Sequence, residues 1–326
     1  MSGAGAGAAE LAAAERAIGE LPLLQGLAPV ELHRLAALAE PFALAEGELL
    51  YREGDVDGRI YVIERGAIRT GTAEPIGPGQ VVGEMAALAR LPRHASAVAV
   101  EPSSGWAIDA AAVGELAGAP GAVGVAQRFG LRAVGRLRTQ YDALTDFLDA
   151  DERIFEPARP SSLDLAGPVV PADAELATSD YMRTLLFFSV FNEGELATLF
   201  GDLRRLEAPR GAALVAQGER PGALLAVLRG AVETTIRHGG AAVRARLSGP
   251  GRFAGRLGVL DAGVSPVTCR ARERTILLEI PDERVRELVG DPSRAARRFT
   301  RGLYADVVEA LFQARRPMAR MAARGG

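Results

Sequence analysis

The chain has 326 residues but no lysine, and it holds one cysteine and three histidines. Without lysine, Schiff-base chemistry on a lysine amine is excluded. The one cysteine, Cys269, excludes an internal disulfide and favours a reducing, cytoplasmic compartment. Cys269 lies in an alternating stretch at 267–271, a pattern typical of a strand, so we expect its thiol to be buried.

Long apolar runs and a basic excess are absent as well. No run is long enough to cross a bilayer, and residues 1–14 lack the basic start and apolar core of a signal peptide. The formal net charge of −3 argues against a chain dominated by nucleic-acid contacts. With 48% hydrophobic and 24% charged residues, the composition indicates a soluble globular protein, long enough for two domains with separate cores.

Signatures of the common enzyme classes are also missing. The sequence has no kinase signature, no phosphate-cradling Walker loop, no zinc-binding His/Glu spacing and no Gly-x-Ser-x-Gly elbow. We therefore predict that the chain is not an enzyme and holds no metal.

What the sequence does contain is a short loop suited to a phosphate and a hydroxyl. Gly83 lets the backbone approach a ligand, and the apolar run at 85–88 favours a short helix whose N-terminal N–H groups attract a phosphate. Arg93 adds a planar guanidinium that can donate two parallel hydrogen bonds to phosphate oxygens. The carboxylate of Glu84 can accept hydrogen bonds from ribose hydroxyls.

This segment resembles the phosphate-binding cassette of the cyclic nucleotide-binding domain family. Upstream, the glycine-punctuated segments 47–55, 60–66 and 77–79 follow the strands of the same family. The resemblance implies a fold that is mostly β with α, made of tandem cyclic nucleotide-binding β-barrel or jelly-roll domains, each with flanking helices. The many short segments with Gly or Pro at their turns between residues 42 and 108 predict the same kind of barrel.

The resemblance also implies a ligand and the residues that hold it. The ligand is expected to be a cyclic nucleotide monophosphate, with cyclic AMP preferred to cyclic GMP, because His94 stands where cyclic GMP-selective relatives carry a hydroxyl. The alternative is that His94 faces solvent and takes no part in binding. The expected ligand-binding residues are Gly83, Glu84, Met85, Ala86, Arg93, His94 and Ala95.

A second copy of the pattern follows from internal comparison. Three glycines recur at a shift of 164, for example 218 minus 54, so that the pairs are Gly47 and Gly211, Gly54 and Gly218, and Gly66 and Gly230. After the middle hairpin the shift becomes 172, which pairs 77–79 with 249–251 and Gly83 with Gly255. The second hairpin, turning at 239–240, is therefore eight residues longer, 172 minus 164.

The two copies differ at the positions that would hold the ligand. At the shift of 172, Glu84 corresponds to Arg256 and Arg93 corresponds to Ser265. An arginine cannot accept a hydrogen bond from a hydroxyl, and a serine carries no charge to offset a phosphate. We predict that Gly255, Arg256 and Ser265 form a degenerate second site with a structural or partner-binding role. One alternative stays open, in which Arg256 holds some other anion in a rearranged loop.

Residues 9–39 have a helical pattern, Asp109 resembles an N-cap, and Pro120 can open a long helix. Too few residues follow the second copy for a DNA-reading domain, so no DNA binding is expected. The expected organisation is an Ala-rich N-terminal tail at 1–20, a first cyclic nucleotide-binding domain at 21–118, a long helix at 119–148, a Pro-rich linker at 149–178, a second, cyclic nucleotide-binding-like domain at 179–288, and a C-terminal helix with a basic tail at 289–326.

The long helix carries an apolar stripe at steps of three and four, formed by Val134, Leu137, Tyr141, Leu144 and Leu148. The stripe fits a short coiled coil in a homodimer, as the corresponding helix forms in the catabolite activator family. It equally fits packing of the helix against its own barrel. Just over two heptads do not distinguish these arrangements, and both remain open.

Two functions fit these features. The first is a cytoplasmic sensor of cyclic AMP or cyclic GMP that binds its ligand in the first domain and signals to an unidentified protein partner. The second is a structural or assembly protein that uses both barrels as interaction modules without ligand. Glu84 and Arg93 favour the first function, whereas the degenerate second cassette and the missing output domain favour the second.

Overall fold

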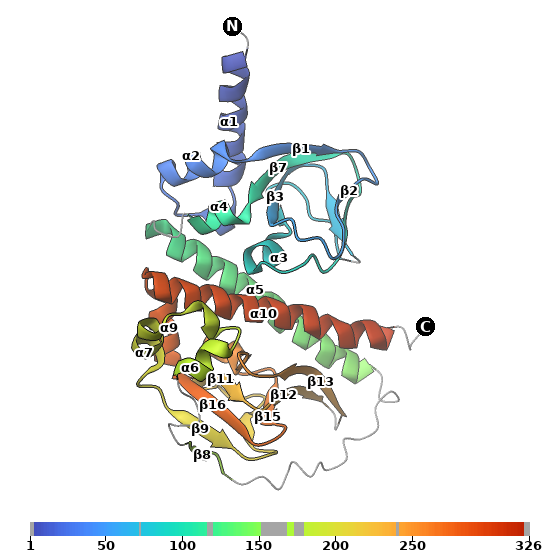
Figure 1. Ribbon diagram of the computed structural model, residues 1–326. Helices are drawn as coiled ribbons and strands as arrows, with labels where there is room; N and C mark the ends of the chain where they lie inside the picture. Colours follow the sequence, from blue (N-terminus) through green and yellow to red (C-terminus); the bar gives the residue numbers. More distant parts are fainter. Residues whose placement is uncertain are drawn as a thin grey trace. The chain divides into compact units, whose positions relative to one another are not determined.

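The computed structural model describes residues 3–71, 73–115, 120–150, 168–172, 179–238 and 241–322. The chain divides into two compact units, unit 1 at Met1–Phe129 and unit 2 at Gly130–Gly326. Figure 1 shows that each unit combines β-sheets with helices.

The described strands of unit 1 form two antiparallel sheets, one in the order β1-β7-β3-β5 and the other in the order β2-β6-β4. Buried side chains from both sheets form a core between them, including Tyr51, Ile63 and Ile68. The strands are β1 (Glu40–Leu44), β2 (Leu49–Tyr51), β3 (Arg59–Arg65), β4 (Ile68–Thr70), β5 (Val81–Val82), β6 (Ala97–Ala99) and β7 (Ser103–Asp109).

The helices of unit 1 correct one expectation. The predicted N-terminal tail at 1–20 contains α1 (Gly3–Gly19), and Ala14 and Ile18 on this helix are buried in the core at 1% and 0% exposure. Two apolar residues four apart share one helix face, which gives this Ala-rich stretch a surface to bury. The helices after α1 are η1 (Pro22–Leu24), α2 (Pro29–Ala37), α3 (Glu84–Ala89), α4 (Ala110–Glu115) and α5 (Pro120–Ala150), of which α5 continues into unit 2. The helical pattern predicted at 9–39 is thus interrupted after Gly19.

Unit 2 repeats this architecture with additions. Its sheets run β14-β11-β16-β9-β8 and β10-β15-β12-β13. The strands are β8 (Val170–Pro171), β9 (Arg205–Ala208), β10 (Ala213–Val215), β11 (Ala223–Arg229), β12 (Val232–His238), β13 (Ala241–Ser248), β14 (Phe253–Ala254), β15 (Thr268–Ala271) and β16 (Thr275–Pro281). The helices are α6 (Ser179–Thr184), η5 (Phe188–Val190), α7 (Glu193–Phe200), α8 (Arg256–Val259), α9 (Asp282–Gly290) and α10 (Arg294–Ala322).

The two copies agree in backbone conformation as well as in strand order. Eight of the glycines paired by the sequence comparison have positive φ, at values between 75° and 90°: Gly47, Gly54, Gly66, Gly83, Gly211, Gly218, Gly230 and Gly255. At Gly66 a Cβ would overlap Ser103, and at Gly230 it would lie 2.7 Å from the carbonyl oxygen of Arg274. A side chain is thus excluded at the same corner of both barrels.

Two predicted boundaries change. The stretch assigned to a linker at 149–178 contributes β8, whose Val170 pairs with Glu207 of β9, while residues 151–167 and 173–178 lie outside the described part. The C-terminal helix runs to Ala322. Most of the basic tail predicted within 289–326 is therefore helical, because Arg315, Arg316 and Arg320 lie on α10, and Arg324 lies outside the described residues.

The apolar stripe of α5 is buried within the chain. Val134, Leu137, Tyr141 and Leu144 are each at most 1% exposed, and the side chain of Leu148 lies outside the described part. These positions belong to unit 2, where Arg138 on the same helix forms an ion pair with Asp261 at 2.7 Å. The stripe thus packs in unit 2, and its buried residues are not available as a seam for a second copy.

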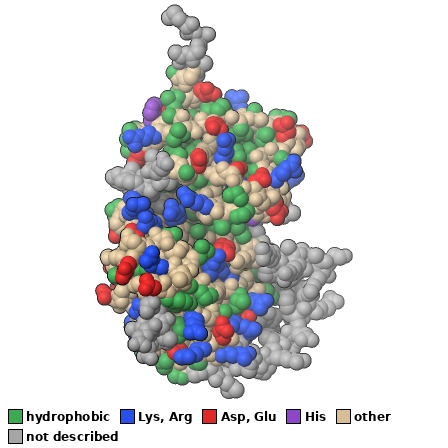
Figure 2. All heavy atoms as spheres, viewed as in Figure 1, with side chains coloured by type: hydrophobic (Ala, Val, Ile, Leu, Met, Phe, Trp, Pro, Cys, Tyr) green, Lys and Arg blue, Asp and Glu red, His purple; other side chains and the backbone are tan. Residues whose placement is uncertain are grey.

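The described helices include none with the length and apolar character needed to span a membrane. On the face shown in Figure 2, acidic and basic side chains are intermingled. Cys269 lies on β15 at 1% exposure, with its Sγ 3.7 Å from the hydroxyl of Thr234, and burial raises the pKa of the thiol. The thiol is therefore buried, as its strand pattern predicts.

Candidate functional site

The first cassette, residues 83–95, begins where β5 passes into α3. Gly83 has a φ of 81° at the N-cap of α3, and a Cβ at this position would overlap the guanidinium of Arg93. The close approach of the Arg93 side chain to the Gly83 backbone therefore requires glycine here. Glu84 follows at the first position of α3 and is 2% exposed.

Arg93 is the centre of this site. Its side chain is 1% exposed, and its Nη1 donates a hydrogen bond of 2.5 Å to the carbonyl oxygen of Gly83. Its Nη2 donates to the carboxylate of Asp57 and to the carbonyl oxygen of Arg59. A buried cation is costly unless it is paired and hydrogen-bonded, and these partners hold the guanidinium in one orientation.

Two tyrosines complete the surroundings of Arg93. Its guanidinium carbon lies 4.2 Å from the centre of the Tyr51 ring and 5.7 Å from that of Tyr61. Burial raises the pKa of both phenols to about 12, although Arg93 acts in the opposite direction. The Tyr61 hydroxyl donates a hydrogen bond of 3.1 Å to Asp57, so Tyr61 and Arg93 converge on one carboxylate.

One donor of Arg93 is left over. Its Nε is buried and has no hydrogen-bond partner within the part of the chain that the structure describes. Each buried donor without a partner is unfavourable by about 1 to 3 kcal/mol. An anion placed beside Arg93 would supply the missing acceptor.

The other predicted site residues lie around this arginine. Met85 and Ala86 are buried on α3 at 2% and 3% exposure, whereas His94 and Ala95 are half-buried after Arg93. Three residues around Arg93 were not predicted from the sequence: Asp57, Tyr51 and Tyr61. A signal existed for them, since their counterparts at the shift of 164 are Pro221, Val215 and Leu225, and each loses its polar group in the copy that also loses Arg93.

The second cassette, residues 255–267, keeps the backbone of the first at its two ends but not its chemistry. Gly54 N–H donates to the Arg93 carbonyl at 2.7 Å, and Gly218 N–H donates to the Ser265 carbonyl at 2.8 Å. A Cβ at Gly255 would lie 3.4 Å from Val215 and 3.9 Å from Pro221. The carbonyl oxygen of Ala223, at 3.0 Å, and these two apolar side chains thus surround the position beside which the Arg93 guanidinium lies in the first cassette.

Ser265 and Arg256 are both buried, at 1% and 4% exposure. The Ser265 hydroxyl donates to the carbonyl oxygen of Val267 at 2.7 Å, which satisfies it locally. Arg256 donates through Nε to Asp306 on α10 at 2.9 Å. The short helix α8 is broken by Leu257 at ψ 143° and by Gly258 at φ 86°, so the second cassette is rearranged.

A sequence model described as "cyclic nucleotide-binding domain" matches residues 41–119 and 205–291, which together are just over half of the chain. The two matches coincide with the two barrels. Among the described residues, no three of His, Cys, Asp and Glu gather in a group that could hold a metal ion.

Curated relatives match over short segments. The chain is 35% identical over 86 residues to a cAMP-dependent protein kinase regulatory subunit of Blastocladiella emersonii, covering 24% of this chain and 21% of that protein. It is 34% identical over 122 residues to the acetyltransferase Pat of Mycolicibacterium smegmatis, covering 35% of this chain and 34% of that protein. The chain thus spans about a third or less of the length of these relatives.

One solved structure that the chain matches is a mutant form of the regulatory subunit of a cAMP-independent protein kinase A from Trypanosoma brucei, bound to cAMP in the A site. Its sequence is 17% identical, the similarity covers 87% of this chain and 88% of that chain, and the TM-score is 0.33.

Proposed function

The chain belongs to the cyclic nucleotide-binding domain family, and from this premise we propose that its first domain, residues 21–118, binds one purine 3′,5′-cyclic monophosphate. The second domain, residues 179–288, binds none. The single observation that carries the proposal is the Arg93 guanidinium, which is 1% exposed, oriented by Asp57, and left with a buried Nε that has no partner among the described residues.

The ligand would be held by groups of complementary chemistry. Arg93 would donate to the exocyclic phosphate oxygens, and Glu84, at the start of α3, would accept from the ribose 2′-hydroxyl. Gly83, Met85, Ala86 and Ala95 would shape the loop around the phosphate. Asp57 would act as a positioning residue, because it holds Arg93 without reaching the ligand.

We further propose a mild preference for cyclic AMP. His94 is half-buried directly after Arg93, where an imidazole can stack on either purine but offers no hydroxyl to guanine. Discrimination between the two ligands should therefore stay below about tenfold, or roughly 1.4 kcal/mol.

The proposed role is regulatory and non-catalytic, in the cytoplasm, with a protein partner as the output. Pat shows that a relative of this chain can be an acetyltransferase, but no catalytic motif accompanies the barrels here. Ligand binding shifts a helix only when two helix positions have different affinity for the ligand. The helix α5 directly follows the first domain and is the element that would respond.

Hydrogen exchange tests where the ligand binds. Addition of saturating cyclic AMP should slow amide exchange in residues 83–96 and around Asp57, because binding suppresses the opening of these loops. Exchange in residues 255–267 should not change, since Arg256 and Ser265 replace the two anchors there.

Linear AMP at the same concentration is the control, because it lacks the cyclic phosphate. Protection by cyclic AMP at 255–267 would contradict the assignment of the site. Equal exchange with and without cyclic AMP throughout unit 1 would favour a scaffold protein that uses both barrels without ligand.

A further inference from the structure

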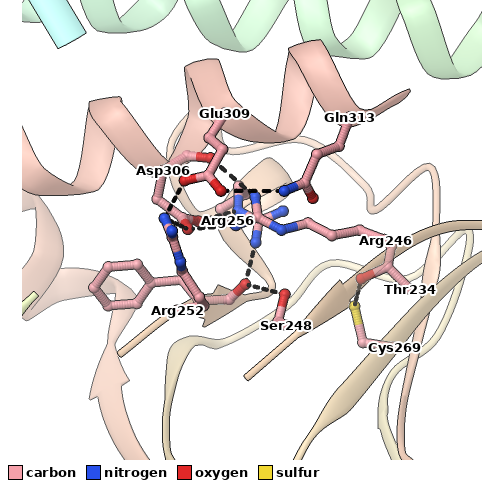
Figure 3. A network of polar contacts seen from close by, with 10 residues as sticks. Thr234, Arg246, Ser248, Arg252, Arg256, Cys269, Asp306, Glu309 and Gln313 are labelled. Carbon is pink, nitrogen blue, oxygen red and sulfur yellow. Dashed lines mark hydrogen bonds and ion pairs between the residues drawn. The ribbon is translucent and has the colours of Figure 1, made fainter. Parts of the chain in front are cut away.

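A buried polar network lies between the second barrel and α10 (Figure 3). Arg246 on β13, Arg256 on α8 and Asp306 on α10 are exposed by only 3%, 4% and 3%. Figure 3 shows both arginines directed from the barrel toward Asp306. All three residues belong to unit 2.

The carboxylate of Asp306 is bound as an anion ligand would be. Its Oδ1 accepts from Nη2 of Arg246 at 2.7 Å, and its Oδ2 accepts from Nε of Arg256 at 2.9 Å. Arg246 also donates through Nη1 to the backbone carbonyl of Asp306 at 3.0 Å. Each carboxylate oxygen thus has its own guanidinium, which is a strong arrangement for an oxyanion.

The surrounding charges leave this site positive. Arg252 lies 3.7 Å from Oδ1 of Asp306 and pairs with Glu309, to which Gln313 donates at 3.1 Å. Three arginines therefore face two carboxylates. Because burial disfavours uncompensated charge, the two buried arginines require the Asp306 carboxylate or another anion in its place.

Two further buried polar atoms at this site lack a hydrogen-bond partner among the described residues. The hydroxyl of Tyr141, a residue 1% exposed, and the Nε of Arg246 have no hydrogen-bond partner within the described part of the chain. Tyr141 interacts electrostatically with Arg246, Arg256 and Asp306, so its hydroxyl lies close to the same charges.

The first copy has no acid at the position that corresponds to Asp306. The helices α9 and α10 follow β16 in the second copy, as α4 and α5 follow β7 in the first. The first residues of α4 and α9 differ by 172 positions, and so do the last residues of α5 and α10. At this shift Asp306 corresponds to Val134, because 306 minus 172 is 134. The carboxylate is thus particular to the copy that has lost the ligand-binding pair.

We propose that unit 2 carries an oxyanion site formed by Arg246 and Arg256, that Asp306 of α10 occupies this site as a ligand in cis, and that removal of the Asp306 carboxylate opens it to a small external carboxylate. Occupation by Asp306 fastens α10 to the barrel whether or not unit 1 binds nucleotide. The second domain is then held in one arrangement with α10 by its own chain.

Chemical rescue of the full-length Asp306→Ala variant by sodium formate tests this site. Formate supplies the two carboxylate oxygens that the substitution removes. Trp106 is the one tryptophan and is 5% exposed in unit 1, so its fluorescence reports the unfolding of unit 1. A calorimetric transition without a matching change in Trp106 fluorescence therefore reports the unfolding of unit 2. In sodium chloride the Asp306→Ala variant should lose roughly 10 °C in the unit 2 midpoint. Formate at equal ionic strength should raise that midpoint by several degrees, while the wild-type midpoint stays the same in both salts.

Glu309→Ala is the matched control, because Glu309 is a partly exposed carboxylate one turn away on α10 whose ion pair is with Arg252. It should show no formate-specific gain. An equal response of the wild type and Asp306→Ala to formate would overturn the proposal. If Asp306→Ala does not fold in chloride, refolding from denaturant in formate should recover it, and failure in both salts would overturn the proposal as well.

Discussion

Replacement of Arg93 by alanine is expected to weaken cyclic AMP binding by on the order of 2 to 5 kcal/mol, roughly thirtyfold or more. Arg93 would face a full phosphate charge from a site in which its side chain is 1% exposed, and charge-assisted hydrogen bonds are about twice as strong as neutral ones. Glu84→Ala should cost less, since Glu84 would meet only a neutral ribose hydroxyl. Calorimetric titration of both variants with cyclic AMP measures the difference.

Arg69→Ala is the matched control, because Arg69 is an exposed arginine on β4 of the same unit. Its affinity for cyclic AMP should match that of the wild type. Trp106 fluorescence should report a folded unit 1 in Arg93→Ala, since Asp57 is 26% exposed and water can hydrate the carboxylate that the arginine leaves. Wild-type affinity in a folded Arg93→Ala variant would remove the phosphate from this site.

The largest stability effect is expected at Asp306. Asp306→Ala leaves Arg246 and Arg256 buried without their carboxylate, and breaking a buried pair in this way typically costs about 3 to 5 kcal/mol. Arg246→Ala should cost less, because Asp306 and Arg256 would remain as a one-to-one pair. Arg252→Ala should cost about 1 kcal/mol or less, as Arg252 is 29% exposed and its pairs are partly screened. Denaturant unfolding of unit 2 in the three variants checks this order, and equal losses would contradict it.

The same carboxylate gives unit 2 an acid dependence. Burial alone would raise the pKa of Asp306, but Arg246, Arg256 and Arg252 outweigh it and hold the pKa of this carboxyl below its usual value. A group with a lowered folded-state pKa contributes stability above its unfolded pKa, and that stability is lost as the pH falls through the folded value. The difference between wild type and Asp306→Ala in the free energy of unfolding of unit 2 should therefore become smaller below about pH 4. Tyr141 and Glu309 also lie near the Asp306 carboxyl. Burial raises the pKa of Tyr141, so its phenol stays neutral in this acidic range.

The sequence predicted the barrels because their corners depend on single residues. Positive φ is required at matching corners of the two barrels, as at Gly54 and Gly218 or at Gly66 and Gly230. Such corners favour glycine, so a single sequence shows them as glycines at a constant spacing. The same comparison located the loss of Glu84 and Arg93 in the second copy. Whether a helix such as α1 would pack on the core was harder to see, since Ala-rich composition fits both a tail and a buried face.

Contacts between distant segments could not be predicted in this way. Asp57 meets Arg93 because the loop before β3 lies beside the end of the first cassette, where Arg93 N–H donates to the Asp55 carbonyl at 2.8 Å. Asp306 lies 50 positions after Arg256 and meets it only when α10 packs on the barrel. The sequence did hold one signal for a buried acid. Asp306 is the one acidic residue between Leu303 and Val307, which are both fully buried, in a segment with helical periodicity.

Calorimetric titration of the wild-type chain with cyclic AMP, cyclic GMP and linear AMP tests the central claim most directly. We predict one site per chain for cyclic AMP, binding of cyclic GMP within about tenfold, and much weaker binding of linear AMP. Two equivalent sites per chain would contradict the assignment of Arg256 and Ser265 to a degenerate cassette. No heat of binding with any of the three nucleotides at millimolar concentration would contradict the sensor function itself.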